Sequence, residues 1–136
     1  MTTSTTIEAV FIPAVGSEQD LARAAYLASL ADSSATGVLI ARLALRRAGV
    51  VDVPQSPDLV YPSMESPICG INLKDRKIRK GPIGLIDKWV SSTGGFCHCR
   101  LRSVVSQITN RGGYAIVIAT ETVVLGVVYL KTIQAA

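Results

Sequence analysis

A nearly uncharged run between residues 112 and 130 is the feature that decides whether this chain contains a membrane span or folds as a globular domain. The run approaches the length of a membrane-spanning helix, but Glu121 lies in its middle between two threonines. Its many β-branched residues favour two short strands joined by a turn; they are Ile116, Val117, Ile118, Val123, Val124, Val127 and Val128. We therefore predict a terminal hairpin of strands 114–119 and 122–130 in a globular protein that makes no direct membrane contact.

The size and apolar content of the chain fit one folded domain. A single core typically serves roughly 100–200 residues. This chain has 136 residues, 49% of them hydrophobic, and a mean hydropathy of +0.37. Such a composition excludes a disordered chain. We expect a single domain across residues 1–136, in which only residues 1–6, rich in serine and threonine, are loose.

The charge balance is mildly basic, with a net charge of +4 and a pI near 9.2. This balance suits an anionic partner. An aromatic content of 5% is low for a surface that stacks nucleic-acid bases, so we expect a small phosphorylated ligand and no nucleic acid. Three cysteines, without a secretory signal, disfavour a secreted disulfide-linked scaffold. We expect a cytoplasmic domain that is a monomer when isolated.

Turn and capping signals divide the rest of the chain into strands and helices. Ser17 and Asp20 form a capping-box pattern that starts a helix, and Gly49 is placed to end the next one. Four prolines between residues 50 and 67 exclude a helix there and restrict any strand to an edge. The expected order is strand 7–12, helix 18–31, helix 36–48, a short strand near 59–61, hairpin strands 68–73 and 77–79, a helix with Pro82 at its first position, helix 101–109, and the terminal hairpin. Because these elements do not alternate regularly, we predict an α+β fold with helices packed on an antiparallel sheet.

The hairpin between residues 70 and 81 is the strongest candidate for a binding site. It ends in Lys80 and Gly81. A lysine beside a flexible backbone suits phosphate, because the ammonium is a mobile charge and glycine leaves backbone N–H groups accessible. We expect Lys80 to be exposed at the end of the hairpin. The other interpretation is a solvated charged edge that discourages strand addition, formed with Lys74, Arg76, Lys77 and Arg79.

Independent catalysis has little support in the sequence. The single histidine, His98, supplies no Ser-His-Asp arrangement that could be argued, and the aspartates show no paired-carboxylate spacing. Cys97-His98-Cys99 invites a zinc interpretation, but structural zinc sites usually place about two to four residues between paired cysteines. We therefore expect free thiols, no metal site and no catalytic residue. Trp89 lies on the apolar stripe of its helix and is expected in the core.

Six segments of the chain carry a resemblance to a known family. They are Phe11-Ile12-Pro13-Ala14, residues 25–32, Gly70-Ile71-Asn72, Ile78-Arg79-Lys80-Gly81, Gly94-Gly95 and residues 124–131. In order and spacing, over nearly the whole chain, they resemble the nucleotide-binding domain of the Kdp-type potassium-transporting P-type ATPase. The resemblance implies a twisted antiparallel sheet of about six strands flanked by helix pairs.

The same resemblance implies a binding site for ATP. In the family a Lys-Gly motif lies beside the nucleotide, and it corresponds to Lys80 and Gly81. A glycine in the connection between the first two helices corresponds to Gly37. Tyr61 is the nearest match to the aromatic ring that stacks on adenine. The resemblance leaves open whether Mg²⁺ accompanies the nucleotide.

Two further positions complete the implied nucleotide site. Cys69 stands where the family has a serine, and Gly70 follows it and permits close approach of the backbone. The family's phosphorylated sequence, Asp-Lys-Thr-Gly-Thr, is absent from this chain. The resemblance therefore implies a domain that positions ATP for an aspartate in a separate domain and does not hydrolyse it alone. The partners it implies are the other domains and subunits of an inner-membrane potassium pump.

Two other functions stay open. Where the family has a glutamate, an arginine, a serine and a second serine, this chain has Thr36, Val38, Leu39 and Cys69. These differences make a structural or interaction domain that has lost its nucleotide the first alternative. A basic module for RNA is the second, and a steep salt dependence of binding would distinguish it.

Overall fold

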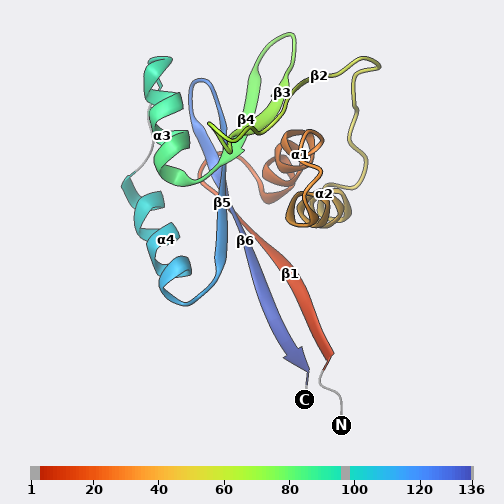
Figure 1. The fold of residues 1–136 in the computed structure, drawn as a ribbon, viewed down its shortest axis with the longest axis vertical. Helices are drawn as coiled ribbons and strands as arrows, with labels where there is room; N and C mark the ends of the chain where they lie inside the picture. Colours follow the sequence, from red (N-terminus) through yellow and green to blue (C-terminus); the bar gives the residue numbers. More distant parts are fainter. Residues whose placement is uncertain (1–3, 96–98, 136) are drawn as a thin grey trace.

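The computed structural model describes residues 4–95 and 99–135 (Figure 1). Its elements, in chain order, are β1 (Ser4–Pro13), α1 (Glu18–Ser29), α2 (Ala35–Ala48), β2 (Asp58–Val60), β3 (Cys69–Asn72), β4 (Lys77–Gly81), α3 (Ile83–Ser92), α4 (Cys99–Asn110), β5 (Tyr114–Thr120) and β6 (Val124–Ala135). Cys97 and His98 lie outside the described residues, and Cys99 is the first residue of α4.

The strands form one antiparallel sheet in the order β1-β6-β5-β4-β3-β2. Helices α1 and α2 lie together on one side of this sheet, and α3 and α4 lie on the other (Figure 1). The predicted α+β fold, a six-stranded antiparallel sheet between two helix pairs, is therefore confirmed. Strands β1 and β2 are the two end strands, so they lie at opposite edges of the sheet.

Alternation along the central strands gives each helix pair its own core. In β5, Ile116 and Ile118 join the cluster that includes α1 and α2, whereas Val117 and Ala119 join the cluster that includes α3 and α4. Successive side chains of a strand point to opposite faces. A continuous apolar run is therefore what a strand covered on both faces requires.

The terminal hairpin forms as predicted, with β5 paired to β6. In the part of the chain that the structure describes, no helix has both the length and the apolar content needed to cross a membrane. Strand β6 continues to Ala135 and pairs with β1 from its first residue, Ser4. The expectation that residues 1–6 are loose is therefore wrong for residues 4–6. Their strand partner comes from the other end of the chain and leaves no local signal.

The helix ends lie within two residues of those predicted from the local sequence signals. The Ser17 hydroxyl accepts a hydrogen bond from the Asp20 N–H at 3.1 Å, and the Asp20 carboxylate accepts one from the Ser17 N–H. Gly49 ends α2 with a φ of 86°, in the left-handed region that favours glycine. Pro82 precedes the first residue of α3 as its N-cap, one position earlier than predicted.

Candidate functional site

Strand register brings most of the predicted nucleotide-binding residues to one edge of the sheet. Gly70 of β3 lies between Val60 of β2 and Arg79 of β4, and Cys69 is the direct partner of Lys80. Tyr61 follows β2 immediately, so it emerges beside this pair. Residues from three separated segments of the sequence therefore meet where β2, β3 and β4 run side by side.

Lys80 is buried in this sheet and is not exposed at a hairpin end. Its side chain is 1% exposed, and its Nζ lies 2.9 Å from Oδ2 of Asp32 and 3.0 Å from Oγ of Ser29. The expectation of an exposed Lys80 is wrong because β4 continues to Gly81 and pairs with β5 beyond Arg79. The lysine therefore occupies an interior position of the sheet, and its ammonium reaches the end of α1.

Asp32, the partner of this lysine, lies in the connection between α1 and α2. Its carboxylate also accepts a hydrogen bond from the Ser34 N–H at 3.1 Å. Partial burial raises the pKa of Asp32, but the hydrogen bonds from Lys80 and Ser34 and the charge of Lys80 outweigh burial, so this pKa lies below its ordinary value. Asp32 is thus ionised at neutral pH and joins the helix pair to β4. Sequence reasoning included Asp32 in a family segment but gave it no role at the site.

Gly37, which the resemblance assigns to a nucleotide site, lies close to Asp32 of the same ion pair. Its N–H donates to Ser34 Oγ at 3.0 Å, which caps the start of α2. A Cβ at this position would lie 2.2 Å from Cγ of Asp32. Glycine is therefore required here because the aspartate passes so close to the helix backbone.

Gly70 meets a similar constraint within the sheet. A Cβ at this position would lie 1.9 Å from the carbonyl oxygen of Ile78, a backbone atom that has little freedom to move. The neighbouring Arg79 is 8% exposed, and its guanidinium donates to the carbonyl oxygens of Ile71 and Ile78 and to Oδ1 of Asn72. Gly70 therefore permits the close approach of β3 and β4 that this arrangement needs.

Arg79 and Trp89 form a contact that sequence reasoning missed. The guanidinium carbon lies 5.4 Å from the centroid of the Trp89 ring, within the range of a cation–π interaction. Trp89 is half-buried and packs against the α3–α4 core, as its place on the apolar stripe predicted. The only sequence signal for the contact was the alternation of Arg79 and Lys80 to opposite faces of one strand.

The remaining predicted residues differ sharply in exposure. Tyr61 is 67% exposed, so one ring remains available to a ligand. Cys69 is buried with its Sγ 3.7 Å from the carbonyl oxygen of Ala28, and burial raises the pKa of its thiol despite the nearby charge of Lys80. Gly81 is buried against Ile68, whose Cγ1 would lie 3.1 Å from an added Cβ.

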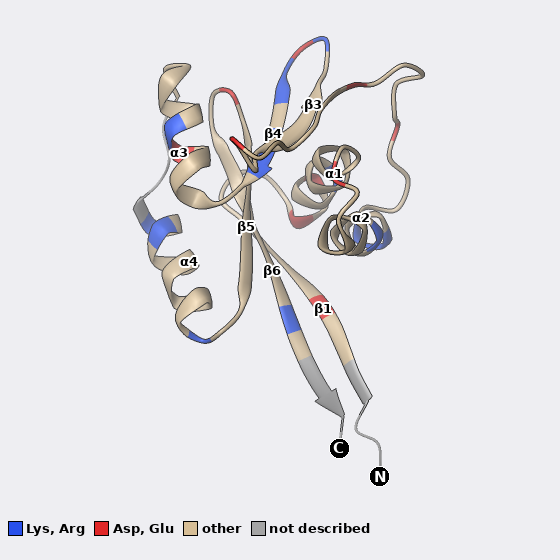
Figure 2. Cartoon of the chain, viewed as in Figure 1, with Lys and Arg blue, Asp and Glu red and all other residues tan. Residues whose placement is uncertain are grey.

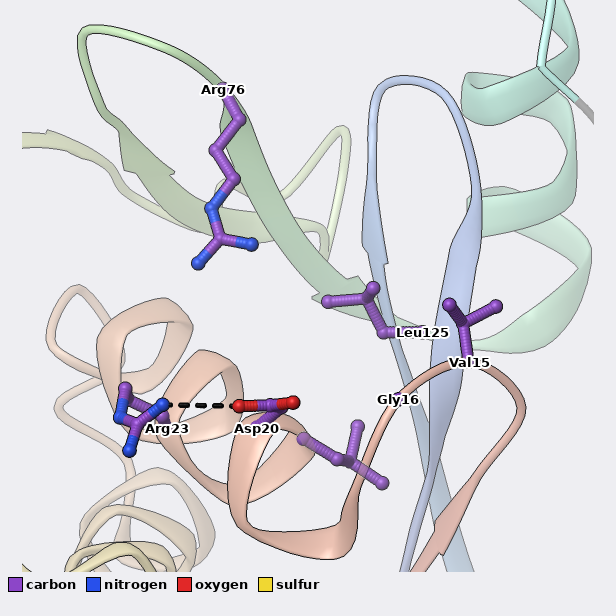
Figure 3. A pocket seen from close by; sticks show the side chains of 7 residues that line it. Val15, Gly16, Asp20, Arg23, Arg76 and Leu125 are labelled. Carbon is purple, nitrogen blue, oxygen red and sulfur yellow. Dashed lines mark hydrogen bonds and ion pairs between the residues drawn. The ribbon is translucent and has the colours of Figure 1, made fainter.

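A separate pocket of about 330 Å³ lies at the other end of α1 (Figure 3). It is lined by Val15, Gly16, Asp20, Leu21, Arg23, Arg76 and Leu125. Arg76 reaches toward it from the β3–β4 hairpin, and Arg23 is held by an ion pair with Asp20 at 3.1 Å. None of the predicted nucleotide-binding residues belongs to this lining. Across residues 4–95 and 99–135, no group of three or more His, Cys, Asp or Glu side chains is arranged to hold a metal ion.

Comparisons with known proteins give relatives that share nearly the whole chain. The potassium-transporting ATPase ATP-binding subunit of Clostridium botulinum (strain Alaska E43 / Type E3) is 38% identical over 127 residues, which make up 90% of this chain and 18% of that protein. The subunit of the same name from Tolumonas auensis is 38% identical over 129 residues, 92% of this chain and 19% of that protein. No family model matches the chain. The chain thus spans less than one fifth of the length of these curated relatives.

Solved structures with the same fold are also known. One crystal structure of a zinc-transporting PIB-type ATPase matches with a TM-score of 0.68 and 15% identity, over 96% of this chain and 20% of that one. A crystal structure of such an ATPase in another state matches with a TM-score of 0.62 and 13% identity over the same shares. At these identities the likeness establishes the fold, a six-stranded sheet between helix pairs.

Proposed function

Homology over nine-tenths of its length makes this chain a relative of the potassium-transporting ATPase ATP-binding subunits, and from this we propose that it is an adenine-nucleotide-binding domain. The site that we propose consists of Lys80, Gly81, Tyr61, Cys69, Gly70 and Gly37. The observation that carries the proposal is their position on neighbouring strands: Tyr61 follows β2, Cys69 of β3 pairs with Lys80 of β4, and Gly37 lies close to Asp32, the ion-pair partner of Lys80.

In this proposal the flat adenine base lies at the edge formed by β2, β3 and β4. Val60 and Arg79 lie two strands apart, which corresponds to roughly 10 Å at ordinary strand spacing. Tyr61 at the outer strand can stack on a base, and stacking of this kind contributes about 1–3 kcal/mol per base. Gly70 is the register partner of Arg79, and Gly81 packs against Ile68, so both glycines face the side of the sheet opposite the Lys80 side chain.

Lys80 has a different role from the one that its sequence suggests. Its ammonium has three N–H donors, and Asp32 and Ser29 accept two of them. The Lys80–Asp32 pair is neutral as a whole, so it attracts a polyphosphate weakly. We assign the remaining donor to the base or ribose, which reaches this buried ammonium by displacing the groups that cover it. The phosphates then lie toward solvent, where a second domain can reach them.

The mechanism that we propose is positioning. The chain lacks the phosphorylated aspartate sequence of the family, so it supplies no nucleophile. Holding the nucleotide by its base lowers the entropic part of the barrier to phosphoryl transfer, while the bond-making chemistry takes place at an aspartate of a separate domain. In this proposal Mg²⁺ arrives with the phosphates, the domain lies on the cytoplasmic side of a potassium pump, and the pump's other domains and subunits are its partners.

One observation favours a second candidate, a domain of this fold that has lost its nucleotide. Val38 is 56% exposed beside Gly37, where the family has an arginine. The same holds at three other positions, where the family carries residues with stronger or longer polar groups: Thr36, Leu39 and Cys69. An exposed aliphatic side chain at a ligand site lowers the number of available polar contacts, which makes ATP binding weak or absent in this alternative.

Truncation of Tyr61 tests the stacking contact. We expect Tyr61→Ala to weaken ATP binding by about tenfold or more, because the ring supplies the stacking energy, and to change the free energy of unfolding by less than about 0.5 kcal/mol, because the side chain is exposed. Calorimetric titration with ATP and urea denaturation measure the two quantities. Val10→Ala is the control, since that side chain is exposed on β1, at the opposite edge of the sheet from β2. Equal ATP affinities of the two variants would show that Tyr61 does not contact the nucleotide.

A further inference from the structure

A groove between α2 and β1 lies at the sheet edge opposite the proposed nucleotide site. Two adjoining cavities of about 310 and 320 Å³ form it, and they share Ile7, Leu43 and Arg46. Phe11 lines one cavity and Leu39 the other. We call this surface, made by β1 residues 6–11 and α2 residues 39–47, the α2–β1 groove.

The lining of the α2–β1 groove is apolar. Phe11 is buried as part of the α1–α2 core, whereas Ile7 is 43% exposed, and Leu39 and Leu43 are half-buried. Aliphatic side chains from a helix and a strand thus face a common hollow. The groove can accept small branched side chains, which would remove this apolar surface from water.

Arginines border the same groove. Arg42 and Arg46 are exposed, and neither has an ion-pair partner among the residues that the structure describes. Arg47 is held by an ion pair with Glu18. Figure 2 shows basic residues on α2. One acid, Glu8, lies in the lining, and its register partner on β6 is the cation Lys131. The groove is therefore positive along its helical side.

The strand side of the groove is an open sheet edge. Strand β1 spans Ser4–Pro13, and in the described sheet it pairs on one side only, with β6. An end strand presents backbone N–H and C=O groups on its open side, here along residues 7–12, that another extended chain can use. The edge and the groove run along the same residues, so one bound segment would contact both.

We propose that the α2–β1 groove binds an extended, acidic polypeptide segment that adds to the sheet beside β1. Alternate aliphatic side chains of the segment enter the groove between Ile7 and Leu43, and its carboxylates meet Arg42 and Arg46. Backbone hydrogen bonds to β1 hold the segment, the groove selects small apolar side chains, and the arginines select negative charge. The groove and the nucleotide site use opposite ends of the sheet, β1 and β2, whereas α2 contributes to both, with Gly37 at the nucleotide site and residues 39–47 at the groove.

The test uses a fluorescently labelled short peptide of alternating glutamate and valine, with binding followed by anisotropy at physiological salt. We expect the wild-type chain to bind this peptide and to bind alternating lysine–valine or glutamate–glycine peptides much more weakly. We expect R42E/R46E to weaken binding at least about tenfold. The control R100E/R111E carries the same change of charge on exposed arginines elsewhere and should change affinity less than about twofold. Amide hydrogen exchange should slow in β1 on binding.

Three results would overturn the proposal. If the glutamate–glycine peptide bound as tightly as the glutamate–valine peptide, charge attraction alone would explain binding and the apolar groove would have no part in it. If R42E/R46E and R100E/R111E lost equal affinity for the peptide, binding would depend on the net charge of the chain and not on the α2–β1 groove. Sedimentation that shows a dimer of the wild-type chain, abolished by R42E/R46E, would assign the groove to a second copy of the chain.

Discussion

Replacement of Lys80 by alanine is expected to destabilise the fold by about 3–5 kcal/mol, the usual cost of removing one partner of a buried ion pair. The ammonium is 1% exposed, and its loss leaves the Asp32 carboxylate without its cation and Ser29 Oγ without its donor. Urea denaturation gives the free energy of unfolding. This expectation reverses the one drawn from the sequence, in which an exposed lysine could be removed with little effect on the fold.

A second pair of variants separates the charge from the packing of the Lys80 stem. Lys80→Met keeps most of the aliphatic volume and should remain clearly destabilised, since Asp32 is still unpaired. The double variant Lys80→Met/Asp32→Asn should recover part of that loss, because it removes the charge that lacks a partner. A Lys80→Ala protein within about 1 kcal/mol of wild type would contradict the buried pair.

The same ion pair predicts loss of stability in acid. The pKa of Asp32 is lower in the folded chain than its unfolded value of about 3.9, so the folded state binds protons less readily. The stabilisation is therefore present above about pH 4 and is lost as the pH falls through the folded pKa. Denaturation curves between pH 6 and pH 2 should show a smaller pH dependence for Asp32→Asn than for wild type. Identical profiles of the two proteins would exclude a contribution from this carboxylate.

Substitution of Gly70 by alanine is expected to cost about 3 kcal/mol or more, at or above the upper end for overpacked sites. The added Cβ would lie 1.9 Å from the carbonyl oxygen of Ile78, so β3 must separate from β4 to accommodate it. Separation also disturbs Arg79, which donates to the backbone of both strands. Urea denaturation and amide exchange in β3 and β4 measure the effect.

Two other glycines calibrate this result. Gly37→Ala should also be strongly destabilising, because its Cβ would meet the Asp32 carboxyl group at 2.2 Å and displace it from Lys80. Gly84→Ala is the control: beyond its chain neighbours and the backbone of its own helix, α3, no atom lies within 4 Å of the added methyl group. It should leave stability unchanged or raise it by up to about 1 kcal/mol. Equal effects at Gly70 and Gly84 would contradict the close approach of β3 and β4.

Local patterns in the sequence were sufficient to predict much of the fold. The capping box of Ser17 and Asp20 depends on neighbouring residues and is found as predicted. The β-branched run around Ile116–Val117–Ile118 is buried on both faces and forms a central strand. Residues 4–6 were missed because their pairing depends on β6, whose sequence lies at the other end of the chain.

The exposure expected for Lys80 was wrong, whereas the membership of the nucleotide site stays a prediction. Family resemblance directed attention to Tyr61, Lys80 and Gly37; Tyr61 follows β2, Lys80 pairs with Cys69 of β3, and Gly37 lies close to Asp32. The spacing of apolar residues in the sequence indicated neither the burial of Lys80 nor its ion pair with Asp32. Lys80 lies in a strand and Asp32 in the connection between two helices, so no regular spacing links them. A charged residue in a strand is predicted to be exposed unless its partner is known, and partners distant in sequence have no periodic signature.

The most direct test of the proposed nucleotide site is a titration of the isotopically labelled wild-type chain with ATP, followed by backbone amide chemical shifts. We expect saturable shifts at Tyr61, Cys69, Gly70, Lys80, Gly81 and Gly37, with the rest of the sheet little affected. The amides lining the pocket between Arg23 and Arg76 should stay unchanged. Absence of shifts at millimolar ATP, or shifts confined to that pocket, would contradict a nucleotide site at the β2–β3–β4 edge.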